Sequence, residues 1–202
     1  MEDQYKTILR PSAETLFKEK GSKFFGYAYP VQNQDDVEQA LQQIRRKHPT
    51  ARHCCYAWQL GLETQQFRVN DDGEPSHTAG MPIYGQIQSF GLTNVLVVSV
   101  RYFGGTKLGV GGLIQAYKTS AKMAIEASAI AIKTINITYE LRFDYEQMNQ
   151  VMRLVKEHQL NIVKQDMQLR CQLQFEIRKS EASRIEEILS SMHKIAFEKL
   201  IL

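Results

Sequence analysis

The chain's central feature is a run of apolar residues, Val95 to Val100, with Ser99 as its one polar member, followed by a glycine-rich segment. An apolar run without alternation predicts a strand that is buried on both faces of a sheet. After Gly112, small and apolar residues recur at helical spacing, and this pattern fades around Ser128. The hydrophobic pattern therefore predicts a strand, a glycine loop and a helix in direct succession.

The residues before this unit predict a mixed set of strands and helices. Aromatic and β-branched residues interrupted by short turns favour an antiparallel meander of strands at Gln4 to Arg10, Glu14 to Lys20 and Lys23 to Val31. A helix is expected from Gln34 until Pro49 stops it. The remaining elements are strands at Cys54 to Leu60 and Gln66 to Val69, and a helix from about Ala79 to Ser89.

From Ile135 the pattern changes to βαββαβ, which is typical of a ferredoxin-like domain. Its strands are expected at Ile135 to Phe143, Asn161 to Asp166, Gln168 to Arg178 and Ile195 to Ile201, with helices at Tyr145 to His158 and from Ser180 to about Met192. We therefore predict an α+β protein with two domains, residues 1–131 and 135–202, of which the first is a two-layer β-α domain.

Composition and charge are those of an ordinary globular protein, with 43% hydrophobic and 23% charged residues. The net charge of +3 lies entirely in residues 1–133, which hold 15 Lys or Arg and 12 Asp or Glu. No run is long enough to cross a membrane, and the first residues do not resemble a signal peptide, so a cytoplasmic location is expected. The three cysteines form no disulfide or zinc pattern.

Five of the chain's 12 glycines, Gly104, Gly105, Gly109, Gly111 and Gly112, follow the buried strand, with Lys107 among them. Glycine permits close approach of the backbone, and a helix N-terminus presents free N–H groups. Together they favour an anion site. The alternative is that the glycines only make a tight turn and a close contact between helix and strand. The spacing matches neither the P-loop nor the dinucleotide-binding fingerprint.

A second unusual segment places Asp71, Asp72 and Glu74 within four residues. Carboxylates so close together need cations, backbone N–H groups or a metal ion. Three functional interpretations stay open, namely a magnesium site, an acid–base pair, or an acidic partner for the cations of the glycine loop. The structural alternative is an Asp-Gly turn with helix caps. We expect Arg101 or Lys107 to neutralise the cluster.

Two further clusters favour structural roles. His53 precedes Cys54 and Cys55, but neighbouring strand residues point to opposite faces, so buried structural cysteines are favoured over a metal or nucleophile site. The run Arg45 to His48 closes a predicted helix, where cations complement the helix dipole, and this favours a solvated helix end over a nucleic-acid patch.

Several segments of the first domain together resemble the YigZ/IMPACT family. They are Lys20 to Phe24, Asp71 to Ser76 with Thr78 to Gly80, and Arg101 to Gly105 with Lys107 to Gly109, Gly111 to Leu113 and Ala116-Tyr117. The C-terminal pattern is similar to the extra domain of bacterial YigZ-type members. His77 departs from the family pattern, which has glycine there.

The resemblance implies a first domain like the second domain of a small-subunit ribosomal protein, and a second like a late domain of elongation factor G. Eukaryotic IMPACT tunes translational stress signalling through protein contacts, whereas bacterial members offer no settled reaction. The resemblance thus implies a translation-related binding module. Its expected partners are RNA, the ribosome or a translation-associated protein.

For this chain the expected ligand residues are Asp71, Asp72, Glu74, Arg101, Gly104, Gly105, Lys107, Gly109, Gly111 and Gly112, with no catalytic residue, metal or cofactor assigned. An enzyme acting on a phosphate-bearing small molecule, with the acidic loop holding a metal, is the alternative. A purely structural partner protein is a third. The sequence leaves open whether any reaction is catalysed.

Overall fold

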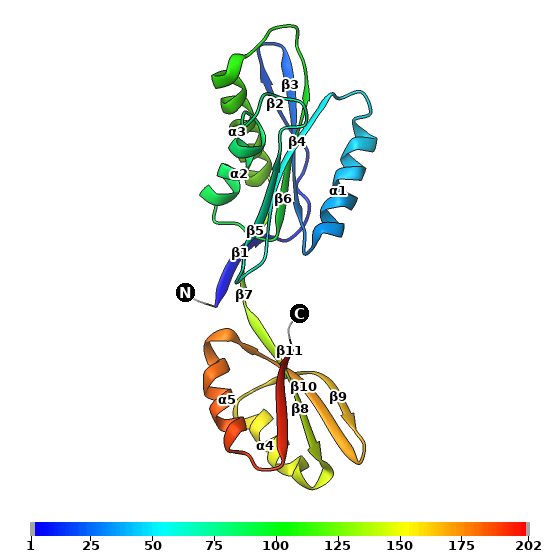
Figure 1. Ribbon diagram of the computed structural model, residues 1–202, viewed down its shortest axis with the longest axis vertical. Coiled ribbons are helices and arrows are strands. Elements are labelled where there is room, and N and C mark those ends of the chain that lie inside the picture. The colour runs from blue at the N-terminus through cyan, green and yellow to red at the C-terminus, as the bar shows by residue number, and fades with distance from the viewer. Residues whose placement is uncertain (1–2, 201–202) are drawn as a thin grey trace. The chain divides into compact units, whose positions relative to one another are not determined.

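The computed structural model describes residues 3–200, and the chain divides into two compact units (Figure 1). The first unit is Tyr5–Lys133, and the second contains residues 134–200 together with residues 3 and 4. Both units combine helices with antiparallel sheets, so the α+β class is confirmed. Within residues 3–200, no helix is long and apolar enough to cross a membrane.

A five-stranded antiparallel sheet forms the centre of the first unit. Its strands lie in the order β2 (Thr15–Glu19), β3 (Ser22–Pro30), β6 (Val95–Tyr102), β4 (His53–Leu60) and β5 (Gln66–Asn70). The apolar strand β6 is in the middle and is buried along nearly its whole length. This position explains its continuous apolar run, because side chains on both of its faces meet a hydrophobic core.

Helices cover both faces of this sheet, as Figure 1 shows. On one face lie α2 (Gly80–Ser89) and α3 (Gly109–Glu126), and on the other lies α1 (Gln34–Lys47). The sequence predicted two layers, whereas the unit has three. The third layer forms because β3, β4 and β6 carry apolar residues on both faces, and the second apolar face is covered by Val37, Ala40 and Ile44 of α1.

The first strand differs from its predicted place in a meander. Only β2 and β3 form the expected hairpin, while β1 (Gln4–Ile8) pairs with β7 (Ile130–Thr134) in a separate two-stranded sheet. The two-residue turn of the hairpin is Lys20-Gly21, and both residues have positive φ, as a type I′ turn requires. Strand pairing between β1 and β7 joins two segments more than a hundred residues apart in the sequence, which local periodicity cannot predict.

The second unit has the predicted ferredoxin-like order. Its sheet runs β11 (Ile195–Leu200), β8 (Asn136–Asp144), β10 (Arg170–Arg178) and β9 (Asn161–Met167). The helices α4 (Met148–Glu157) and α5 (Ala182–Ser191) supply the apolar side chains that pack on one sheet face. Leu169, expected within a strand, lies instead in the turn before β10 and is 90% exposed.

We predict that residues 135–202 fold as an isolated fragment, because their hydrophobic core is complete without the first unit. Asp3 lies outside that fragment and accepts hydrogen bonds from Arg178 and Ser180, so the fragment should melt at a lower temperature than the second unit of the whole chain. Circular dichroism of the fragment measures this. A disordered fragment beside a stable whole chain would contradict the prediction.

Candidate functional site

Arg101 and Glu74 form a buried ion pair beneath the glycine loop. Arg101 Nη1 lies 2.7 Å from Glu74 Oε1, and the two side chains are only 6% and 5% exposed. The Tyr117 hydroxyl donates to the same carboxylate oxygen at 2.8 Å. Arg101 also donates to Ser22 Oγ. The expected neutralisation of the acidic cluster by Arg101 is thus confirmed for Glu74.

Asp71 organises the backbone of the acidic loop. Its carboxylate accepts hydrogen bonds from the backbone N–H groups of His77, Ala79 and Gly80, at 2.8 to 2.9 Å. Burial by itself raises the pKa of this carboxyl, but the three N–H groups outweigh burial and hold the pKa below its usual value. Asp71 therefore fixes the start of α2, as the structural alternative of helix capping proposed.

Asp72 connects the loop to α1 and β4. Its Oδ2 accepts the Cys54 N–H at 2.7 Å, and its Oδ1 lies 3.5 Å from Arg45 Nη2. Its backbone carbonyl is 2.9 Å from His53 Nδ1. The charge of Asp72 is thus partly balanced from α1, and Lys107 takes no part in this pairing.

Each carboxylate of the acidic loop is bound by the protein's own donors. Among the residues that the structure describes, no group of three His, Cys, Asp or Glu side chains is placed to hold a metal ion. Cys54 and Cys55 are buried free thiols, as predicted. Burial raises the pKa of the Cys54 thiol to about 11 and that of Cys55 further, so neither is an activated nucleophile.

The beginning of the glycine loop is held by a close backbone contact. A Cβ on Gly104 would lie 1.8 Å from the carbonyl carbon of Gly21, in the turn between β2 and β3. The Gly104 N–H donates to Ser22 Oγ, which also accepts from Arg101. Gly104 is therefore a packing glycine, which supports the structural alternative at this one position.

The rest of the glycine loop is exposed and leads into α3, which begins at Gly109 rather than near Gly112. Gly105 and Gly109 have positive φ, where glycine is favoured. The first turn of α3 has no acidic residue, and the side chain of its N-cap residue, Leu108, makes no capping hydrogen bond. Lys107 and the residues from Gly109 to Gly111 are exposed, so backbone N–H groups and a cation lie close together in the sequence at an accessible helix start, as an anion site would require.

His77 occupies a backbone conformation that explains the glycine of the family pattern. Its φ is 62°, in the left-handed region that a residue with a Cβ adopts at a cost. Its backbone N–H still donates to Asp71. The substitution thus leaves the loop's hydrogen bonding in place.

Three residues that bind members of the predicted site, Ser22, Tyr117 and Arg45, were not themselves predicted as site residues. Ser22 lies in a recognised segment, but a lone serine after a turn gives no signal of its partner. Tyr117 was named only within a segment that resembles the family; it is fully buried, and its hydroxyl donates to Glu74. Arg45 was expected at a solvated helix end, whereas it pairs with Asp72. Sequence patterns do not predict these contacts, because each one joins residues that are far apart in the sequence and belong to different elements.

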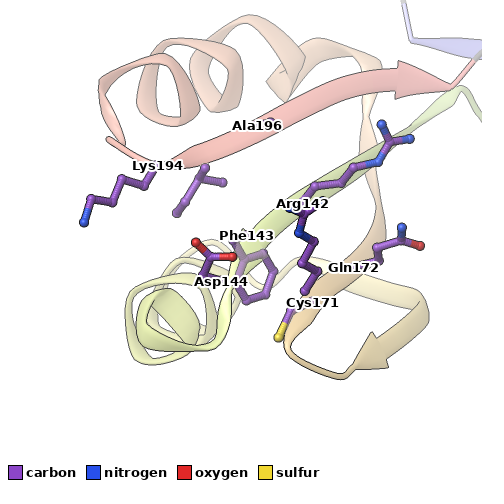
Figure 2. A pocket seen from close by; sticks show the side chains of 9 residues that line it. Arg142, Phe143, Asp144, Cys171, Gln172, Lys194 and Ala196 are labelled. Atoms are coloured by element: carbon purple, nitrogen blue, oxygen red, sulfur yellow. The ribbon is translucent and has the colours of Figure 1, made fainter.

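A cavity of about 690 Å³ lies in the second unit, at the end of the sheet formed by β8, β10 and β11 (Figure 2). Its charged groups are of both signs, with Arg142, Arg170 and Lys194 near Asp144. Arg142 is already paired with Glu140 and Glu198, at 2.7 Å from each. This cavity therefore presents a mixed surface without a convergent set of donors, in contrast to the start of α3.

Comparison with known proteins identifies the first unit. Residues 20–125 match the model of the Impact N-terminal domain. An IMPACT family member of Haemophilus influenzae is 34% identical over 164 residues, which cover 79% of this chain and 80% of that protein. The IMPACT family member YigZ of Escherichia coli is 37% identical over 139 residues, covering 66% and 68%.

The similarity extends over both units. The crystal structure of a hypothetical protein, 27% identical, superposes with a TM-score of 0.72 over 99% of this chain and 98% of its own. The resemblance expected from the glycine-rich and acidic segments is thereby confirmed. The chain belongs to the IMPACT family.

Proposed function

We propose that this protein is a translation-related binding module that holds single-stranded RNA by a backbone phosphate at the start of α3. The observation that carries the proposal is the exposed, uncapped first turn of α3, with Lys107 beside it. Free N–H groups and the positive end of the helix dipole attract an anion, and a flexible cation adds to that attraction. The family resemblance to proteins that tune translation supports RNA as the source of the phosphate.

Gly111 supports a ligand that approaches the backbone. Its φ is not positive, and a Cβ there would have no atom of residues 3–200 within 4 Å apart from its two chain neighbours and the nearby backbone of its own helix. Alanine would fit and would stabilise a helix by up to about 1 kcal/mol. Neither backbone conformation nor packing therefore requires glycine at this position. Close contact between a phosphate and the helix backbone would require it, because a Cβ would stand in the way.

Apolar side chains beside the loop favour a nucleic acid over an isolated phosphate. Phe103, Val110 and Ile114 are 56%, 60% and 38% exposed. Val110 and Ile114 are one helical turn apart and share a face of α3. Exposed aromatic rings beside a basic groove are the usual means by which proteins hold single strands without a fixed sequence. The surface thus offers a place for bases as well as for phosphate.

The enzymatic alternative receives less support from the same geometry. It requires Asp71, Asp72 and Glu74 to hold a metal or accept a proton, and all three are engaged in hydrogen bonds or ion pairs within the protein. Binding without chemistry accounts for the arrangement more simply.

Lys107→Glu is expected to weaken binding of short single-stranded RNAs of every sequence. Reversing the charge removes one phosphate contact, so the negative slope of log affinity against log salt should become less steep by about 1 or more. The matched control is Lys118→Glu, which makes the same charge change at an exposed position farther along α3. Fluorescence anisotropy with labelled five-nucleotide RNAs at several salt concentrations measures both variants.

Equal effects of the two lysine variants would contradict the proposal, since general electrostatic attraction would then suffice. Failure of the unchanged protein to bind any of the RNAs at low salt would also contradict it. Melting temperatures of both variants should match that of the unchanged protein, because both side chains are exposed.

A further inference from the structure

A second cavity, of about 300 Å³, adjoins the beginning of the glycine loop. We call it the His48 pocket, and it is lined by Gly21, Lys23, Phe25, His48, Tyr102 and Phe103. Tyr102 and Phe103 lead directly into Gly104, and Gly21 is the residue against which Gly104 packs. The pocket therefore adjoins the beginning of the glycine loop, and the later part of the same loop, from Lys107 to Gly112, carries the proposed phosphate site.

The walls of this pocket are mainly aromatic. Phe25 has its ring centroid 5.0 Å from that of His48 and 5.7 Å from that of Tyr102, and the His48 and Tyr102 rings are also 5.7 Å apart. The exposed Phe103 ring stands at the edge, and Lys23 is exposed beside it. Such walls suit a flat, unsaturated ring better than an aliphatic or sugar group.

A chain of hydrogen bonds fixes the protonation of His48. The Tyr27 hydroxyl donates to Glu14, which also pairs with Lys47 Nζ at 2.6 Å. Because the Tyr27 hydroxyl hydrogen is used in this way, the Tyr27 oxygen is free to accept a hydrogen bond from the Nε2–H of His48, at 2.6 Å. This assignment leaves Nδ1 of the neutral imidazole without a proton, so that it accepts the Tyr102 hydroxyl at 3.1 Å.

The consequence of this chain lies at the Tyr102 oxygen. Because its hydrogen is directed to His48, the oxygen presents only lone pairs to the pocket. Burial lowers the pKa of His48, although Glu14 opposes that effect, and the neutral form assumed above is thereby favoured at neutral pH. The pocket thus presents aromatic faces and an acceptor oxygen to whatever enters it.

We propose that the His48 pocket binds one unstacked nucleobase of the RNA strand whose phosphate lies at the start of α3, with an N–H group of the base donating to Tyr102. This inference rests on the proposed function and names the part of the ligand that the second cavity holds. The base would lie against Phe103 and Phe25, and Lys23 would face the adjoining backbone phosphate. Recognition of unstacked bases on aromatic side chains is the common mode for single-stranded RNA.

The test uses the full chain and two labelled probes, a five-nucleotide single-stranded RNA and the same strand with its central base absent. The unchanged protein should bind the complete strand more tightly. Tyr102→Phe should weaken binding of the complete strand by about fivefold to tenfold, as expected for one lost hydrogen bond, and leave binding of the abasic strand unchanged. Phe103→Ala should have a similar or larger effect, through lost stacking.

Tyr145→Phe is the matched control, since Tyr145 is 65% exposed and belongs to the second unit. It should alter neither affinity. Phe103→Ala keeps the test decisive if Tyr102→Phe proves unstable, because Phe103 is largely exposed and its loss should not disturb the fold.

Equal affinity of the unchanged protein for both strands would overturn the base pocket while leaving the phosphate site in place. The same conclusion follows if Tyr102→Phe and Phe103→Ala weaken both strands equally. If neither strand binds, or if Lys107→Glu leaves the binding of both strands unchanged, the proposed function itself fails and the base pocket fails with it.

Discussion

Replacing Glu74 by alanine is expected to lower the free energy of unfolding of the first unit by about 3–5 kcal/mol. The substitution leaves the Arg101 guanidinium buried without its carboxylate, and the Tyr117 hydroxyl loses the same acceptor. Arg101 Nε already has no partner within residues 3–200, so the remaining hydrogen bond to Ser22 does not compensate for the loss. Chemical denaturation monitored by fluorescence measures the change.

Two further variants distinguish loss of the buried ion pair from the effect of removing any carboxylate. Glu38→Ala removes an exposed carboxylate from α1 and should change stability by less than about 0.5 kcal/mol. The double variant Glu74→Met with Arg101→Met removes both charges, so it should be more stable than Glu74→Ala. A loss below about 1 kcal/mol for Glu74→Ala would show that the pair does not hold the acidic loop in place.

Gly104→Ala is the second substitution with a large expected effect. The new Cβ would lie 1.8 Å from Gly21 C and 2.1 Å from Ser22 N, and both are backbone atoms that cannot turn aside. Overpacking of this kind typically costs about 1–3 kcal/mol, and displacement of the loop would also break the hydrogen bond from Gly104 to Ser22. RNA affinity should fall together with stability.

Gly111→Ala provides the comparison for this experiment, because it adds the same methyl group where no described atom outside its chain neighbours and its own helix backbone lies within 4 Å. Thermal unfolding should show a lower melting temperature for Gly104→Ala and an equal or higher one for Gly111→Ala. If Gly104→Ala melted like the unchanged protein, the close contact between the glycine loop and the β2–β3 turn would be refuted.

Most elements of this fold could be predicted because the hydrophobic pattern of each element shows which of its faces are buried. The continuous apolar run of β6 indicated a strand covered on both faces, and the alternation from Ile137 to Phe143 indicated a strand covered on one. Strand pairing was harder to predict. The pairing of β1 with β7 depends on how the chain returns after more than a hundred residues, which local periodicity does not record.

The candidate site shows the same division. The sequence predicted that Arg101 or Lys107 neutralises the acidic cluster, because carboxylates so close together need a cation. The structure contains an ion pair between Arg101 and Glu74. The roles of Tyr27 and His48 were missed, since an isolated tyrosine in a strand and a histidine at a helix end look like core and cap residues. Their connection to Glu14 and Tyr102 exists only after α1 has packed on the sheet.

The most direct test of the central claim is the response of backbone amide resonances to RNA. In heteronuclear NMR spectra of the full chain, adding a five-nucleotide single-stranded RNA should shift the amide signals of Lys107 and of Gly109 to Gly112, with the shifts saturating as binding is completed. Amides of the C-terminal half of α3, such as that of Lys118, should move little. Saturable shifts confined to other surfaces, with the signals of Gly109 to Gly112 unchanged, would contradict the account.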